Sequence, residues 1–426
     1  MSRRSCFRQI LDVVNVVVLL CLFVSQQLHS DVKLWSQYAS STTPTAEAIM
    51  TKSNGTTTVN SIKVGHRVPT HNKQTEILED DDTDVISIPL IDYHTLLQSE
   101  HTMICILANS GFGSNMIQVL AQKIYYSDRG VNFVADDNQY GYKWNDTTGV
   151  LNGFFQPRFP VFRHGAYNSI HRDYGLPPMG QIMELRAFRA AKSQNNKITV
   201  QWAINEEFRT NFRRQYENGG GFKLYNRFVT EACNHLQFHP RANRVIQNYI
   251  QQYAPNIPSG VHALRRTHSV AFHVRRGDKV YLGESRQFSA QEYVNKLLQL
   301  FQNNDNNIVK KNVTTITDCF VASDDYRAVD EIKKALQDAG IGCQVHYLAS
   351  RVEQQKGIEK ASYRERESTV QFLAELSLLL DATYFIGTFN SNVGSLASVL
   401  RKCHYFGTPH YAHSYGVDRD EWYYIS

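Results

Sequence analysis

The second half of the chain alternates short apolar runs with longer amphipathic stretches. The apolar runs are short and rich in Val, Ile, Phe and Tyr, which is typical of buried strands. The stretches between them place apolar residues at helical spacing. In chain order this predicts strand 270–274, helix 290–302, strand 318–322, helix 328–339, strand 344–348, helix 369–380, strand 384–387 and helix 392–401. Repeated strand–helix units predict a parallel sheet with helices on both faces.

The first half is less regular. An apolar run over 102–108 predicts a strand, Gly111 to Asn115 interrupts it, and 131–135 predicts the next strand. The aromatic, Gly- and Pro-rich stretch 144–178 indicates long loops. Helices are expected over 116–126, 181–192, 206–216, 224–236 and 241–253.

Pro255 and Pro258 end this helical region and mark a domain boundary. We therefore predict two α/β domains, an N-terminal one over 93–262 and a Rossmann-like one over 263–426. A chain of 426 residues is long enough for both and for additional segments.

The N-terminus predicts a membrane anchor. Arg3, Arg4 and Arg8 precede an apolar run from Ile10 to Val24, and positive residues hold that end in the cytosol. We predict a cytosolic tail over 1–9, a signal-anchor over 10–28 and a flexible, Ser- and Thr-rich stem over 29–92. A cleaved signal peptide is the alternative. Either arrangement delivers the body to the secretory lumen, and a Golgi type II orientation is expected.

Glycosylation sequons and cysteines agree with a lumenal body. Sequons begin at Asn54, Asn145 and Asn312. An odd number of cysteines follows the anchor, which requires at least one unpaired or intermolecular cysteine. They are Cys105, Cys233, Cys319, Cys343 and Cys403, with no Cys-x-x-Cys pair, so zinc is not expected.

Candidate chemistry lies where three strands of the second half end. The strand 270–274 runs into Arg275-Arg276-Gly277-Asp278-Lys279, another ends in Ser323-Asp324-Asp325, and a third in Thr388-Phe389-Asn390-Ser391-Asn392. The carboxyl ends of parallel strands lie at one edge of a sheet, where α/β folds bind ligands. Arginine suits a phosphate, and hydroxyl and amide groups at a helix start suit phosphate oxygens. We therefore expect a diphosphate site at this edge.

Two weaker signals have ordinary alternatives. Gly111 and Gly113 lie between a strand and a helix, where backbone N–H groups can bind a ligand, although a tight turn is equally expected. Asp82-Thr83-Asp84 matches an Asp-x-Asp metal motif. No apolar strand precedes it, so a solvated acidic run is favoured and no metal site is predicted.

The motifs together resemble those of the GDP-fucose-dependent fucosyltransferases. His-Val-Arg-Arg-x-Asp-Lys, Ser-Asp-Asp and Thr-Phe-x-Ser-x-Val match best the α1,6 type, which includes N-glycan core and chitin-oligosaccharide enzymes. The resemblance is strongest over 262–400. It implies a GT-B-like fold of two α/β domains facing a cleft, a GDP-fucose donor, a glycan or glycoprotein acceptor, and inverting transfer without a metal or cofactor.

The resemblance also implies roles for individual residues. Arg275 would grip the β-phosphate and Lys279 would add charge to the leaving pyrophosphate. A carboxylate at Glu375 would bind guanine, and Ser391 would lie near the phosphates. The remaining residues of the implied donor site are His273, Arg276, Asp278, Asp324 and Asp325.

The chain departs from this pattern at the expected catalytic base. The family glutamate falls on Gly283, so Glu284 becomes the candidate base. The stem shows no heptads and only a short segment follows the last helix, so the acceptor is left open. An α1,2-type enzyme is one alternative, because Gly277 matches that motif.

Structural roles are also open for each group. Arg275 and Arg276 could be ion-paired, His273 could be a core histidine, and Asp324, Asp325 and Ser391 could cap helices. An inactive lumenal glycan-binding protein on the same fold is a further alternative. Nucleic-acid binding is not expected, since aromatic stacking signatures are missing, and oligomerisation is left open.

Overall fold

The structure is a computed structural model, and all of its described residues lie in the second of two units, Met1–Gln74 and Thr75–Ser426. It describes 101–107, 111–138, 140–145, 148–156, 160–162, 167, 171–178, 191–193, 197–203, 205, 208–212, 221–257, 268–276, 286–302, 316–325, 327–348, 366–405 and 413–418. Within these ranges no helix combines the length and apolar character that a membrane span requires. The predicted tail, anchor and stem lie outside them.

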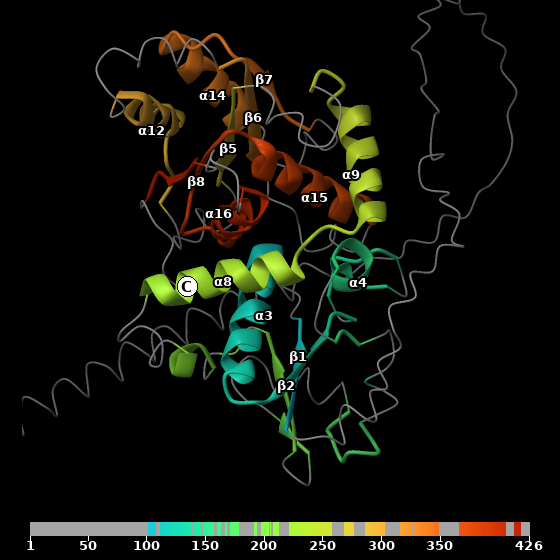
Figure 1. The fold of residues 1–426 in the computed structure, drawn as a ribbon. Helices are drawn as coiled ribbons and strands as arrows, with labels where there is room; N and C mark the ends of the chain where they lie inside the picture. Colours follow the sequence, from blue (N-terminus) through green and yellow to red (C-terminus); the bar gives the residue numbers. More distant parts are fainter. Residues whose placement is uncertain are drawn as a thin grey trace, which may run out of the picture. The chain divides into compact units, whose positions relative to one another are not determined.

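The first sheet has the strand order β2-β1-β4-β3 (Figure 1). Strands β1, β2 and β4 are parallel, and the short β3 pairs antiparallel with β4. The strands span β1 Thr102–Ile106, β2 Asn132–Asp136, β3 Ala191–Lys192 and β4 Ile198–Trp202. The helices of this half are α3 Phe112–Ser127, α4 Val150–Phe154, α8 Gly221–His235 and α9 Pro240–Tyr253.

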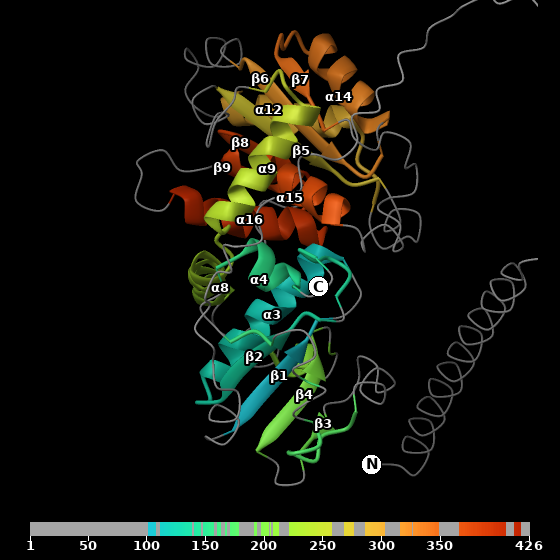
Figure 2. The ribbon, with the colours of Figure 1, turned by 90° about the vertical axis from the view of Figure 1, so that its right-hand side faces the viewer.

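The second sheet has the order β7-β6-β5-β8-β9, and every pair in it is parallel (Figure 2). When the strands are numbered within this sheet, the order is 3-2-1-4-5, which is the Rossmann arrangement. Strands β6 and β7 lie on one side of β5, and β8 and β9 lie on its other side. The strands span β5 Ser269–Val274, β6 Asp318–Ser323, β7 Gln344–His346, β8 Tyr384–Gly387 and β9 His413–Gly416. The helices are α12 Ala290–Gln302, α14 Arg327–Asp338, α15 Arg366–Asp381 and α16 Asn392–Tyr405.

Side chains of β5 alternate between two hydrophobic cores, as the period of a strand requires. Val270, Phe272 and Val274 belong to the core with α12 and α14. Ala271 points the other way, into the core that contains α15 and α16. That second core also includes side chains of β1, α3, α8 and α9, so buried apolar surface continues from one sheet to the other.

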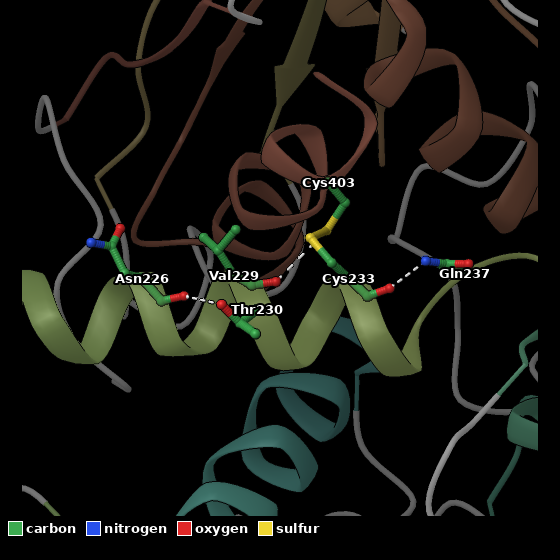
Figure 3. The surroundings of a disulfide bond; sticks show 6 residues. All are labelled: Asn226, Val229, Thr230, Cys233, Gln237 and Cys403. Carbon is green, nitrogen blue, oxygen red and sulfur yellow. Dashed lines mark hydrogen bonds between the residues drawn. A yellow bond between two sulfur atoms is a disulfide. The ribbon is translucent and has the colours of Figure 1, made fainter. Parts of the chain in front are cut away.

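Helix α16 is the element that joins the two halves. It packs on α3 and on α8, and α15 packs on α9 (Figures 1 and 2). A disulfide bond between Cys233 of α8 and Cys403 of α16 closes the same contact (Figure 3). Gly113 in α3 lies so close to α16 that a Cβ there would be 2.6 Å from the backbone of Asn392.

A buried arginine fixes the far end of α15. The side chain of Arg401 is fully buried. Its guanidinium donates to the carbonyl oxygens of Leu379 and Leu380 at 2.7 and 3.1 Å, and to the Ser414 hydroxyl of β9 at 3.0 Å. A cation at the carboxyl end of a helix is favourable, because unpaired carbonyls there carry partial negative charge.

The sequence predicted most of these elements within a few residues. The α/β class and the parallel sheets are confirmed. A second disulfide joins Cys319 and Cys343, and Cys105 is the unpaired, buried cysteine that the odd count required. The division at 262/263 and the cleft between domains stay predictions.

Three expectations about elements were wrong. The stretch 144–178, which was expected to form long loops, contains helix α4 over Val150–Phe154. The predicted interruption Gly111–Asn115 is largely helix, because α3 already begins at Phe112. Ala191–Lys192 is a strand rather than the end of a helix, since it pairs with β4; 181–190 lie outside the described residues. Strands β4 and β9 were not predicted at all.

We predict that Gly113→Ala lowers the free energy of unfolding by roughly 1–3 kcal/mol, the usual range for overpacking. The added methyl group must displace the backbone of Asn392. Denaturant unfolding measures the effect. Gly342→Ala is the control, because Gly342 has open space around it; an equal stability of both variants would contradict the close approach.

Candidate functional site

The candidate site lies at the ends of β5 and β8, two neighbouring parallel strands. Between them the strand order changes direction, because β6 and β7 lie on one side of β5, and β8 and β9 on the other. Arg275 and Arg276 directly follow β5, Asp324 and Asp325 follow β6, and Thr388 to Ser391 connect β8 to α16. Because all these strands are parallel, the three polar segments lie at the same edge of the sheet (Figure 1). The predicted convergence is therefore present.

Asp324 holds the end of β5 with both carboxylate oxygens. Oδ1 accepts from the backbone N–H of Arg276 at 2.7 Å, and Oδ2 lies 2.7 Å from Nη1 of Arg275. The Asp324 side chain is only 7% exposed, whereas that of Arg275 is 21% exposed. The carboxylate thus restrains the guanidinium, which keeps some contact with solvent.

Both arginines are ion-paired, as the structural alternative expects. Arg276 Nη2 lies 2.6 Å from a carboxylate oxygen of Glu331 in α14, and its side chain is 5% exposed. Arg276 therefore attaches the end of β5 to α14. Arg275, by contrast, is paired with Asp324, whose carboxylate is more buried than that of Glu331 and also accepts from the backbone N–H of Arg276. Such a carboxylate can hold the Arg275 guanidinium in one orientation.

Asp325 caps helix α14. Its Oδ1 accepts from the backbone N–H of Arg327 at 3.0 Å, and its carboxylate also binds the Arg327 guanidinium side-on. This pairing lowers the pKa of Asp325 below its ordinary value. The capping role that the sequence left open is present, and it occupies the same carboxylate that was assigned to the donor.

Two residues that sequence reasoning missed organise the loop after β8. Asp418, beyond β9, accepts from the backbone N–H groups of Phe389 and Asn390, each at 2.7 Å. The hydroxyl of Tyr293 in α12 lies 2.6 Å from Oγ1 of Thr388. Neither residue lies near the loop in the sequence, so only the fold could bring them there.

His273 is buried at 7% exposure and packs beside the first turn of α16. A Cβ on Gly394 would come within 3.3 Å of His273 Nδ1 and within 2.2 Å of the carbonyl oxygen of Thr388. Burial, assisted by the charge of Arg275, lowers the pKa of His273 to about 3, so the ring is neutral. The burial agrees with a core histidine, but the expected satisfied histidine is not found, because among the described residues Nδ1 of His273 has no hydrogen-bond partner.

Ser391 directly precedes α16. Its backbone N–H donates to the carbonyl of Thr388 at 3.2 Å, and its own carbonyl accepts from Ser395 at 2.9 Å. The residue is 4% exposed. The first turn of α16 therefore follows β8 after the short connection Thr388 to Ser391, with its N–H groups at the edge where the arginines lie.

Glu375 of α15 is electrostatically coupled to Asp324. Burial and then the negative charge of Asp324 raise the pKa of Glu375 to about 8, while a hydrogen bond from Gln371 opposes the shift. Gln371 is the partner that a carboxyl group in an apolar helix requires. Glu375 is thus protonated at neutral pH and lies near the polar ends of β5 and β6.

The glycines after β1 have separate surroundings. Gly113 packs on Asn392 at the start of α16, whereas Gly111 has open space around its Cα and an ordinary φ of −55°. The N-termini of α3 and α16 therefore approach each other closely. Asp278, Lys279 and Glu284 lie outside the described residues, as does the acidic run with Asp82 and Asp84. Among the described residues no cluster of three His, Cys, Asp or Glu side chains could hold a metal.

No family model matches the chain, and no curated protein matches it. Several solved structures do. The chain is similar to the NodZ α-1,6-fucosyltransferase soaked with GDP-fucose, at 16% identity and a TM-score of 0.37 over 71% of this chain and 93% of that one. A NodZ structure from Bradyrhizobium gives 16% identity, a TM-score of 0.36 and coverage of 71% and 93%.

Two other similar structures hold GDP or GDP-fucose. FUT1 of Arabidopsis thaliana, as a mutant in complex with GDP, matches at 12% identity and a TM-score of 0.40, with 72% of each chain covered. POFUT1 in complex with GDP-fucose matches at 12% identity and a TM-score of 0.41, covering 74% of this chain and 97% of that one. With TM-scores this low, only this chain's own residues support an activity for it.

We predict that the stability of the protein falls as the pH rises from 4.5 to about 8 through deprotonation of Glu375. The pKa of Glu375 is higher in the folded protein than in the unfolded chain, so protonation of Glu375 stabilises the fold. This contribution is complete at a pH below the pKa of the unfolded chain, and it is lost as the pH rises through the pKa of the folded protein. Melting temperatures of wild type and Glu375→Gln across this range measure it. The glutamine variant should match wild type at the acid end and exceed it at the alkaline end; parallel profiles would contradict the assignment.

Proposed function

We propose that this chain is an enzyme that transfers fucose from GDP-fucose to a hydroxyl group of a glycan. The observation that carries the proposal is Arg275. Its guanidinium is directed by Asp324 at the end of β5, at the point where the strand order of a Rossmann sheet changes direction. The motif around it resembles that of GDP-fucose-dependent enzymes, and the position is where such sheets bind nucleotides.

The proposed reaction is a single displacement. The acceptor oxygen forms a bond to C1 of fucose while the bond between C1 and the β-phosphate oxygen breaks. The leaving GDP takes the bonding electrons, and a base accepts the proton of the acceptor hydroxyl. Arg275 and Lys279 stabilise the charge that develops on the diphosphate, as a metal ion does in other transferases. Glu284 is the proposed base.

The structure suggests how the chain directs Arg275 before the donor arrives. Asp324 engages Nη1 of the guanidinium, which has five donors in a rigid plane. A guanidinium restrained in this way binds diphosphate oxygens with less loss of conformational freedom than a mobile side chain does. The N–H groups of the first turn of α16 supply further donors for an anion.

The finer proposals rest on the sequence resemblance. Lys279 supports an α1,6 linkage to a GlcNAc-containing acceptor, whereas Gly277 supports the α1,2 alternative. A protonated carboxyl at Glu375 offers guanine both a donor and an acceptor. We also propose a Golgi type II membrane protein with a lumenal body, and the two disulfide bonds support an oxidising compartment.

A second candidate is a lumenal glycan-binding protein without activity. The ion pairs of Arg275 and Arg276 support it, because they also suit purely structural roles. The two candidates differ in one respect that can be measured directly, since only the enzyme releases GDP when GDP-fucose and an acceptor are supplied.

We predict that Arg275→Lys lowers fucose transfer by roughly 10²–10³-fold, the cost of losing a transition-state donor. Lysine keeps the charge but loses the planar pair of donors. Turnover of labelled GDP-fucose over a glycan array, in the presence of EDTA, measures the effect, and mass spectrometry locates the transferred sugar.

Arg227→Lys is the matched control, because Arg227 is an ion-paired arginine on α8, partnered by Asp128. It should leave turnover unchanged. Normal turnover by Arg275→Lys would exclude the proposed phosphate contact. Absence of turnover by the wild type, with no acceptor fucosylated, would favour the binding protein.

A further inference from the structure

One hydroxyl group joins the two strand ends that border the candidate site. Tyr293 of α12 is 1% exposed, and its hydroxyl lies 2.6 Å from Oγ1 of Thr388, the first residue after β8. The same hydroxyl is hydrogen-bonded to the backbone of Arg275, the first residue after β5.

We propose that Tyr293 is a positioning residue that sets the spacing between the ends of β5 and β8 and thereby directs Arg275. This inference rests on the proposed function, since it assigns the tyrosine a purpose in donor binding. The backbone N–H of Arg275 donates to the tyrosine oxygen, and the hydroxyl groups of Tyr293 and Thr388 share a hydrogen bond in which either can be the donor. One oxygen thus determines how far apart the two strand ends lie.

Thr388 extends this effect to α16. Its carbonyl oxygen accepts from the N–H of Ser391 at 3.2 Å, and Gly394 of the first helical turn packs directly against it. A shift of Thr388 therefore moves the N-terminal turn of α16 as well. Through Thr388 and Arg275, Tyr293 acts on both groups proposed to bind the diphosphate.

The hydroxyl group and the ring of Tyr293 have different contacts, so one substitution can remove the hydrogen bonds and keep the packing. The ring of Tyr293 belongs to the core that contains α12, α14 and one face of β5. Burial raises the pKa of Tyr293 to about 12, so the hydroxyl keeps its proton near neutral pH. Tyr293→Phe removes both hydrogen bonds and keeps the packing of the ring.

We expect Tyr293→Phe to lower kcat/KM for GDP-fucose about tenfold, since the hydrogen bonds that set the spacing of the two strand ends are lost. Most of the loss should appear in kcat, because the guanidinium is then misdirected toward the charge of the transition state. Thr388→Val should cause a similar loss, and Thr388→Ser should retain activity. The double variant should be no worse than either single change, since both break the same connection.

Tyr167→Phe is the matched control. Tyr167 is also 1% exposed and donates to the carbonyl oxygen of Pro177 at 2.8 Å, in the core of the first sheet. It should lose stability without a selective loss of kcat. Equal kcat/KM for Tyr293→Phe, Tyr167→Phe and wild type overturns the positioning role, whereas a wild type that neither binds GDP nor consumes GDP-fucose overturns the proposed function with it.

A different observation supports a modification site. Asn145 begins the sequon Asn145-Asp146-Thr147, and its side chain is exposed although the preceding Trp144 is 5% exposed. The N–H groups of Trp144 and Asn145 donate to the carbonyl of Thr148 at 2.9 and 3.2 Å. The backbones of Lys143 and Gly149 pair in an isolated antiparallel β-bridge. Asn145 thus lies at the surface directly after a buried tryptophan.

We infer that Asn145 carries an N-linked oligosaccharide. The amide nitrogen of Asn145 forms a bond to the anomeric carbon of an oligosaccharide on a lipid diphosphate. The bond from that carbon to the diphosphate oxygen breaks, and the amide proton leaves with the lipid diphosphate. The two disulfide bonds support this independently, because disulfides and N-glycans form in the same oxidising lumen.

The test is expression of the full chain in a eukaryotic secretory host. Digestion with an amidase specific for N-glycans, in heavy-oxygen water, should convert Asn145 to labelled aspartate in its tryptic peptide. Thr147→Val should abolish the label while Asn145 remains. Unlabelled Asn145 in wild-type protein whose two disulfide bonds have formed overturns the inference.

Discussion

The carboxylate of Asp324 is the interaction on which the candidate site depends. It is buried just beyond β6, and it holds the backbone of Arg276 and the guanidinium of Arg275 together. Two charges of opposite sign, both largely removed from water, stabilise a fold only when their geometry is favourable and their other polar atoms are bonded. Here the geometry is set by parallel pairing of β5 and β6, residue against residue up to Val274 and Ser323.

Side chains from elements far apart in the sequence hold the site. Asp324 restrains the segment after β5, Asp418 holds the backbone after β8, and Tyr293 of α12 connects the two. None of these belongs to the polar segment that it holds. Groups that must present charge to a ligand are seldom rigid by themselves, so the surrounding structure has to supply the rigidity.

The sequence predicted which residues meet but not how they bind. Parallel strands place their carboxyl ends together, so the convergence of Arg275, Asp324 and Thr388 followed from pattern alone. Tyr293 looked like an ordinary aromatic on the apolar side of a helix, and nothing local distinguishes its hydroxyl. Strand β9, His413–Gly416, has no apolar pattern, and it is held by pairing with β8 and by the contact of Ser414 with Arg401. Gly113 looked like part of a loop because its close neighbour, Asn392, is distant in the sequence.

The bond between Cys233 and Cys403 spans a sequence separation of 170 residues (Figure 3). During synthesis the earlier sulfur emerges long before its partner is translated, so α8 cannot be covalently fixed while the ribosome is still making the second sheet. The two halves must first pack together through the apolar faces of α3, α8 and α16. The two cysteines are then oxidised to a disulfide bond after this packing has formed. Formation of this disulfide bond is therefore a late step in the maturation of the chain, whatever the order in which its two sheets form.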